Sequence, residues 1–331
     1  MTMTAGSSHA SPAEPVKVLA TKDPGMGLDP GRYLLGRIMG PAMHLADERA
    51  RLAQLTWRNF SIKRLGATIG AEIHGIDITS DLPDDVIAEI TAALHAYKVI
   101  FFRDQPLTAE RHVAFGRRFG DLEVHPFIPA NTGQPELVRF EKTLDSKGVE
   151  NIWHHDVTWR ECPSLGAILH AVHVPECGGD TLFCDMHAAY DGLSDEMKER
   201  IDTLEAEHTF LNSFKRAVPP DQLDAMIEKY PSVVHPLVAT HPATGRKHLY
   251  ANPVFSSKIV GMSDDESAEL LSFLWEQSAR PEYQVRWQWE KDSVAFWDNR
   301  ACQHYASSDY WPDIRIMERA SIVGTRPYRS R

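Results

Sequence analysis

Apolar residues recur at helical spacing in several stretches of the chain. One of these runs ends at Gly120, a residue suited to a left-handed helix stop. Another follows Ser263 and Glu266, which are spaced as a capping box and therefore mark the start of a helix. Where apolar positions lie three or four apart, an amphipathic helix is expected. The pattern predicts helices over residues 83–97, 108–119 and 194–204, and a further helix beginning at residue 263.

Much of the remaining chain consists of short apolar or alternating segments separated by Gly, Pro and Asn. The continuous run Val99–Phe102 is typical of a strand that is buried on both faces. Many short strands favour a sandwich or barrel over a parallel sheet with crossover helices. We therefore predict a mainly β (α+β) fold with flanking helices, a double-stranded β-helix or jelly roll. Further strands are expected within residues 62–78, 165–174, 181–185, 234–240, 247–252, 283–289, 293–297 and 315–323.

Composition divides the chain into two parts. The first 30 or so residues mix Ser, Ala, Pro and Gly, which leaves little apolar surface to bury. A short helix is expected within residues 31–57, a stretch that serves either as an oligomer contact or as a disordered lead-in. We interpret residues 1–58 as a partly flexible N-terminal extension and residues 59–331 as one domain.

The charge balance restricts the possible partners. A formal net charge of −11 argues against nucleic acid and anionic membranes, which require a basic face. An anionic small substrate would have to be attracted by local arginines. No stretch approaches 18 consecutive apolar residues, and no charged-then-apolar leader opens the chain. The four cysteines form no CxxC pair, so we expect reduced thiols in a cytoplasmic protein.

The segment Trp153–Trp159 contains a candidate metal site. In an extended chain, residues two apart point to the same side, so His154 and Asp156 can converge while His155 faces away. His304 would complete a set of two histidines and one carboxylate, which suits Fe(II) and leaves positions open for oxygen and a co-substrate. Zinc could bind the same side chains, and a structural His–Asp hydrogen bond is the simpler alternative for the tripeptide alone.

Two arginines near the end of the chain support this interpretation. Arg315 and Arg319 lie four apart in a predicted strand, so both side chains leave one face, about 13 Å apart. Buried charges need partners, so the pair predicts two bound anions with the metal between them. Alternatively, this row faces solvent, or Glu318 and Asp313 neutralise it, although Glu318 points to the opposite face of a regular strand.

Five motifs, in order and spacing, resemble the taurine dioxygenase family of Fe(II)- and 2-oxoglutarate-dependent oxygenases. The resemblance extends from about Arg64 to Tyr328. It implies a jelly roll that uses Fe(II), 2-oxoglutarate and O2. It also implies that Arg315 and Thr181 bind 2-oxoglutarate, and that Arg319 and His125 bind the substrate anion. The motifs are Trp153–Trp159, Gly178–Thr181, Trp297–Arg300, Gln303–Tyr305 and Arg315–Arg319, and the residues expected to line the substrate cavity are Asn151, Ser213, Phe214 and Phe255.

The resemblance also implies a reaction. Oxidative decarboxylation of 2-oxoglutarate gives succinate and CO2, and hydroxylation of a carbon bearing a sulfonate yields aldehyde and sulfite. Taurine or a related alkyl sulfonate is the expected substrate. However, the family motif His-Pro-x-Tyr-Pro has Ile128 in place of tyrosine, and Asn151 is displaced by one position from Trp153. An alkyl sulfate or aryloxyalkanoate substrate therefore stays open, as does a non-catalytic jelly-roll binding protein. A homo-oligomer is expected by analogy.

The remaining histidines and tryptophans show no shared motif. No GxGxxG or Walker loop supports hydride or phosphoryl transfer. Trp297 is expected to be a core residue that also forms a wall of the iron pocket. The other tryptophans considered, Trp275, Trp287, Trp289 and Trp311, are expected in the core, and His170, His173, His208, His235, His241 and His248 are expected to be satisfied core or surface residues.

Overall fold

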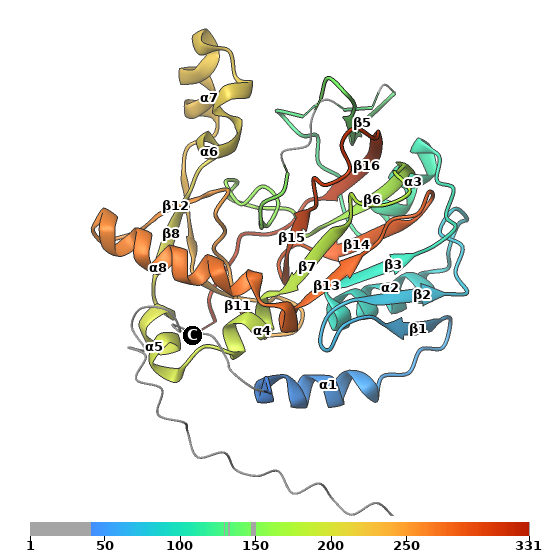
Figure 1. Ribbon diagram of the computed structural model, residues 1–331, viewed down its shortest axis with the longest axis horizontal. Helices are drawn as coiled ribbons and strands as arrows, with labels where there is room; N and C mark the ends of the chain where they lie inside the picture. Colours follow the sequence, from blue (N-terminus) through green and yellow to red (C-terminus); the bar gives the residue numbers. More distant parts are fainter. Residues whose placement is uncertain (1–40, 129, 132, 147–149, 331) are drawn as a thin grey trace, which may run out of the picture. The chain divides into compact units, whose positions relative to one another are not determined.

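The computed structural model describes residues 41–128, 130, 131, 133–146 and 150–330 (Figure 1). Most of the predicted N-terminal extension therefore lies outside the described residues. The short helix expected within residues 31–57 is present as η1 (Met43–Leu45) and α1 (Ala46–Ala53). Leu52 of α1 is buried, and Glu48 lies 2.9 Å from the buried amine of Lys98. Among all the residues that the structure describes, no helix is long and apolar enough to cross a membrane.

An eight-stranded sheet forms the largest element of the fold. Its strands are antiparallel except for the parallel pair β2 and β3. A three-stranded sheet, β13–β7–β15, faces it across a core that includes Phe101, Phe183 and Trp297. Two facing sheets with this core form the predicted jelly roll. In order, the large sheet contains β1 (Ser61–Arg64), β2 (Ala71–His74), β3 (Val99–Phe102), β14 (Val294–Asp298), β6 (Gly166–His173), β16 (Arg315–Ile322), β5 (Gln134–Lys142) and β4 (Ala130–Asn131), and the small sheet contains β13 (Gln284–Trp287), β7 (Thr181–Asp185) and β15 (Cys302–Ala306).

Helices α2 (Asp84–Tyr97) and α3 (Ala109–Arg117) cover the other face of the large sheet. The period of two along each strand separates the two cores. In β14, Phe296 packs with the helices, whereas Trp297 packs between the sheets. The central strands are therefore buried on both faces, as the apolar run at residues 99–102 predicts.

The remaining helices and strands lie outside these two sheets. Ser263 accepts a hydrogen bond from the backbone of Glu266 and completes the predicted capping box at the start of α8. The strands here are β8 (Glu205–His208), β9 (Val233–Pro236), β10 (Val238–Thr240), β11 (Lys247–Leu249) and β12 (Ser256–Ile259). The helices are α4 (Met186–Asp191), α5 (Asp195–Ile201), α6 (Leu211–Phe214), η2 (Lys215–Ala217), η3 (Pro220–Gln222), α7 (Leu223–Lys229), α8 (Asp264–Glu276), η4 (Gln277–Ala279) and η5 (Pro281–Tyr283).

Three local predictions are wrong. Helix α3 ends at Arg117, three residues before Gly120, which therefore does not cap it. The strand predicted over residues 234–240 is split into β9 and β10, which pair with different strands. Trp311 is 62% exposed because it lies in the surface connection between β15 and β16.

Candidate active site

The backbone brings the predicted metal ligands together. His154 and His304 form an isolated antiparallel bridge, with each N–H donating to the other carbonyl at 3.1 and 2.9 Å. Asp156 follows in a turn, where its N–H donates to Asn299 Oδ1 at 2.7 Å and Val157 has a φ of 47°. His155 faces away, as predicted, with its ring 4.9 Å from that of Tyr250. The convergence thus results from a bridge and a turn rather than from a regular strand.

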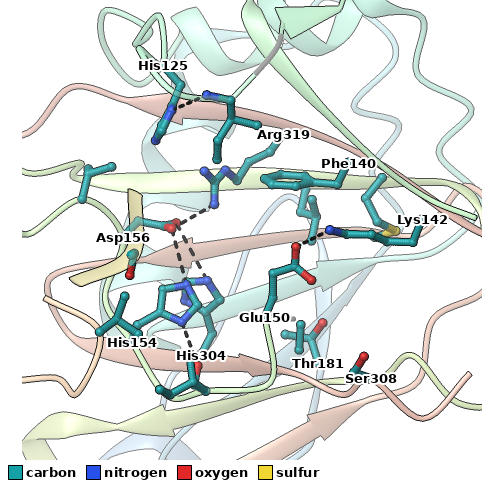
Figure 2. Close-up of a pocket in the computed structure, with 18 of the residues that line it drawn as sticks. His125, Phe140, Lys142, Glu150, His154, Asp156, Thr181, His304, Ser308 and Arg319 are labelled. Atoms are coloured by element: carbon teal, nitrogen blue, oxygen red, sulfur yellow. Dashed lines mark hydrogen bonds and ion pairs between the residues drawn. The ribbon is translucent and has the colours of Figure 1, made fainter. Parts of the chain in front are cut away.

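The side chains of His154, Asp156 and His304 form a compact donor set (Figure 2). Nδ1–H of His154 donates to the carbonyl of Ile152 at 2.8 Å, so Nε2 is left as the donor atom, 3.7 Å from Asp156 Oδ1. Nε2 of His304 lies 3.9 Å from Asp156 Oδ2. All three donors lie within 4.8 Å of one another. Burial holds the pKa of His304 well below its ordinary value, so its nitrogen lone pair is available. The set fits a divalent cation with positions left open.

Arg319 reaches the same carboxylate. Its Nη1 donates to Asp156 Oδ1 at 2.9 Å. Burial alone would raise the pKa of Asp156, but Arg319 and the two histidines lower it to about 2. The carboxylate is therefore ionised, as a metal ligand must be. Glu318 points to the opposite face of β16 and pairs with Arg139, so it does not neutralise Arg319.

Arg315 contrasts with Arg319 at the other end of the cavity. The residue is only 7% exposed, and its Nε and Nη2 have no hydrogen-bond partner among the described residues. Burial lowers its pKa. The backbone of Gly179 approaches the arginine closely, since a Cβ there would lie 3.1 Å from Arg315 Cδ. Nearby, Thr181 Oγ1 accepts a hydrogen bond from Trp289 Nε1 at 3.0 Å. This end presents buried cationic donors to an anion.

One cavity of about 780 Å³ joins these groups. Trp297 forms part of its wall, as predicted, with its ring 4.8 Å from that of His304. Asn151 is exposed and does not line the cavity, whereas the neighbouring residue Ile152 does, although it is also partly exposed to solvent. The predicted residues that do line it are His125, His154, Asp156, Thr181, Ser213, Phe214, Phe255, His304, Arg315 and Arg319.

The geometry of His125 defines its protonation. Its Nδ1 accepts hydrogen bonds from the backbone N–H groups of Phe127 and Ile128 at 3.2 and 3.1 Å, so the ring proton is on Nε2. Burial, together with Arg319, lowers its pKa to about 3. His125 is therefore a neutral N–H donor at the Arg319 end of the cavity (Figure 2).

Strand β5 supplies cavity residues that our sequence analysis missed. Its register against β16 places Lys142 beside Arg315 and Phe140 beside Met317. Lys142 Nζ pairs with Glu150 at 2.5 Å, and the guanidinium of Arg319 lies 5.0 Å from the ring centre of Phe140. The period of two in Val138, Phe140 and Lys142 was the available signal, since these positions share one face of a strand.

Comparisons with known proteins show what the chain is similar to. The family model for the taurine catabolism dioxygenase TauD, TfdA family matches residues 61–321. An alpha-ketoglutarate-dependent sulfate ester dioxygenase from Pseudomonas putida is 36% identical over 78% of this chain and 88% of its own. An alkylsulfatase from Acinetobacter baylyi is 34% identical over 81% of this chain and 86% of its own. The structure of a taurine dioxygenase from Burkholderia xenovorans matches with a TM-score of 0.72 and 39% identity, covering 82% of this chain and 91% of that one.

Proposed function

The chain belongs to the taurine catabolism dioxygenase TauD, TfdA family, and we propose that it oxidises an amine-free alkyl sulfate or alkyl sulfonate. It is a 2-oxoglutarate-dependent dioxygenase. The observation that carries the substrate proposal is the cavity end at Arg319 and His125. There, two anion-binding donors meet an apolar wall, and Ile128 replaces the tyrosine of the family motif.

The two ends of the cavity would hold different anions. His154, Asp156 and His304 would hold Fe(II), which supplies the coupling of 2-oxoglutarate decarboxylation to substrate hydroxylation by O2. Arg315 would bind the distal carboxylate of 2-oxoglutarate, because its unpartnered Nε and Nη2 match the geometry of a carboxylate. The hydroxyl of Thr181 would bind the same carboxylate.

Arg319 and Nε2–H of His125 would bind the sulfur oxyanion of the substrate. The adjoining carbon would then lie near Asp156, the proposed metal ligand that Arg319 contacts. The carbon chain would then lie along the apolar wall. Burial of each methylene contributes about 0.8 kcal/mol. An ammonium group in the same place would lose its hydration without a hydroxyl at residue 128 to compensate. Phe127, Ile128, Phe214 and Phe255 belong to this wall.

The reaction balances for either substrate. An alkyl sulfate, O2 and 2-oxoglutarate give succinate, CO2 and a carbon that carries both hydroxyl and sulfate. Loss of the sulfate with the hydroxyl proton leaves an aldehyde. An alkyl sulfonate gives aldehyde and hydrogen sulfite by the same steps. The printed names of the Pseudomonas and Acinetobacter relatives support the sulfate ester as first candidate.

Taurine is the second candidate, supported by the structural similarity to the Burkholderia xenovorans taurine dioxygenase. Taurine differs from the first candidate in carrying an amine, which would need a hydrogen-bond partner in the cavity. An aryloxyalkanoate stays open in the same cavity, since a guanidinium binds carboxylate and sulfate alike. A homo-oligomeric state and a cytoplasmic location remain predictions from the sequence.

The test is a substrate panel with Fe(II)-loaded protein and 2-oxoglutarate. Hexyl sulfate, hexanesulfonate, taurine and phenoxyacetate are compared by succinate, sulfate and sulfite release. We expect kcat/KM for hexyl sulfate to exceed that for taurine by about 100-fold, because roughly three buried methylenes suffice for that ratio. A preference for taurine or phenoxyacetate would contradict the substrate proposal.

The matched control is Ile128→Tyr, which returns a hydroxyl to the cavity. It should raise kcat/KM for taurine and lower the preference for hexyl sulfate. If the variant leaves the ratio between the two substrates unchanged, residue 128 does not determine it.

A further inference from the structure

A second cluster of potential metal ligands lies on the opposite face of the large sheet. His112 comes from α3, His170 from β6 and Glu318 from β16. The register of the two strands places Glu318 directly beside His170. The three residues are 0, 3 and 6% exposed, and one donor atom from each lies within 4.8 Å of the others. We infer that His112, His170 and Glu318 form a second, structural metal site for a divalent cation such as Zn2+.

The tautomer of His112 is the first argument. Its Nε2 is 3.0 Å from the carbonyl of Ile168, and a carbonyl only accepts, so Nε2 carries the proton. Nδ1 is then a bare lone pair, buried and without a hydrogen-bond partner among the described residues. An imidazole that donates to a backbone carbonyl through one nitrogen and offers the other is the usual arrangement of a metal-ligating histidine.

His170 provides the second donor. Its ring lies 6.2 Å from that of His112 at an interplanar angle of 87°. Its Nε2 faces Asp292 Oδ1 at 3.3 Å, and neither ring nitrogen makes a hydrogen bond of ordinary geometry within the described part of the chain. Two neighbouring buried histidines with unused nitrogens are unusual, because buried polar atoms are nearly always paired.

The carboxylate and the local charge complete the site. Glu318 Oε1 accepts from Arg139 Nη1 at 2.8 Å, and a carboxylate has about four acceptor positions, so a cation can share it. Burial lowers the pKa of both histidines, that of His112 to about 3, so both are neutral. Two carboxylates, those of Glu318 and Asp292, lie beside His170, and negatively charged groups next to neutral imidazoles favour a cation.

The donor types fit a first-row divalent cation. Two imidazoles and one carboxylate can bind Zn2+ with water in the fourth position, and such a site binds Zn2+ more tightly than Fe(II), so Zn2+ is the ion to test. Donors bonded at 2.0–2.1 Å lie about 3.4 Å apart in a tetrahedron, so no pair here has to close by more than about 1.4 Å. The bound ion would join α3 to β6 and β16, directly behind the strand that carries Arg319.

The experiment titrates chelator-treated full-length protein with Zn2+ against a chromophoric chelator. The background variant Asp156→Ala/His304→Ala dismantles the triad, so the remaining site can be measured alone. We expect wild type to bind two Zn2+ per chain and the background to bind one. Adding His112→Gln should weaken that remaining site at least 100-fold. The matched control is His173→Gln, which changes an exposed histidine on β6, the strand that carries His170, and should leave binding unchanged.

The proposal is wrong if wild type binds one Zn2+ and the background variant binds none. It is also wrong if adding His112→Gln to the background variant leaves its affinity for Zn2+ unchanged. If His112→Gln does not fold by circular dichroism, Glu318→Gln takes its place. The wild-type stoichiometry needs no variant. Because the triad is absent from the background, these outcomes are independent of whether the substrate proposal holds.

Discussion

Arg315 and Arg319 occupy the two ends of one cavity and meet opposite environments. Both lie on the same face of β16. Nη1 of Arg319 donates to Asp156 at 2.9 Å and its buried Nε has no partner among the described residues, whereas Arg315 keeps both Nε and Nη2 buried without one. The Arg315 end is thus preorganised for an anion. The Arg319 end has to exchange one anion for another.

The difference follows from what Asp156 does. Its carboxylate pairs with Arg319 and also belongs to the donor set that we propose for the metal. A divalent cation at the triad withdraws charge from that carboxylate and weakens its hold on Arg319. We therefore expect metal binding to prepare the Arg319 end for substrate, while the Arg315 end accepts 2-oxoglutarate without rearrangement.

The largest expected effect comes from removing the shared carboxylate. Asp156→Ala should lower succinate formation at least about 1,000-fold, because an open metal site needs all its protein ligands. Succinate release with the preferred substrate measures this. Asp156→Asn, which keeps the size of the side chain, controls for packing. Unchanged turnover in both variants would mean that the triad is assigned incorrectly.

A smaller expected effect concerns the protonation state of His125, the neutral donor beside Arg319. Burial and Arg319 lower the pKa of His125 to about 3. The ring is therefore protonated only below about pH 3 and is neutral at pH 5.5. We therefore expect His125 to contribute no inflection to the substrate KM between pH 5.5 and 8. A histidine of ordinary pKa would bind the anion more tightly below pH 6.5.

Two variants test this interpretation of His125. In His125→Asn the amide oxygen can replace Nδ1 as acceptor for the loop, but Nε2–H is lost, so the substrate KM should rise about 10-fold at every pH. In His125→Gln the amide N–H can replace Nε2–H, and the KM should rise less. An inflection of wild-type KM near pH 6.5 that both variants abolish would show that His125 acts as a cation instead.

Much of the site could be predicted because its signals are local. The spacing of Arg315 and Arg319 is enough to place both side chains on one face of a strand. The spacing of His154 and Asp156 correctly predicts that the two side chains converge, although a bridge and a turn bring them together instead of a regular strand. The motifs that resemble the family then connect these pairs with Thr181 and His304. The strand prediction for residues 181–185 agrees with β7 at both ends.

What was missed depends on strand register and on distant segments. Strand β5 was not predicted, so the contacts of Phe140 and Lys142 with the face that carries both arginines could not be anticipated. Similarly, His112, His170 and Glu318 come from three separate elements, and only the pairing of β6 with β16 brings two of them together. The pairing partner of Asp156 was also missed, because Arg319 was assigned to the substrate alone.

The KM of each anion in Arg315→Ala and Arg319→Ala measures whether the two arginines bind different anions. We expect Arg315→Ala to raise the KM for 2-oxoglutarate at least about 30-fold, as loss of a charge-assisted hydrogen bond predicts, with the KM for hexyl sulfate within about 3-fold of wild type. Arg319→Ala should give the reverse pattern. Equal increases of both KM values in both variants would show that the two arginines do not bind different anions.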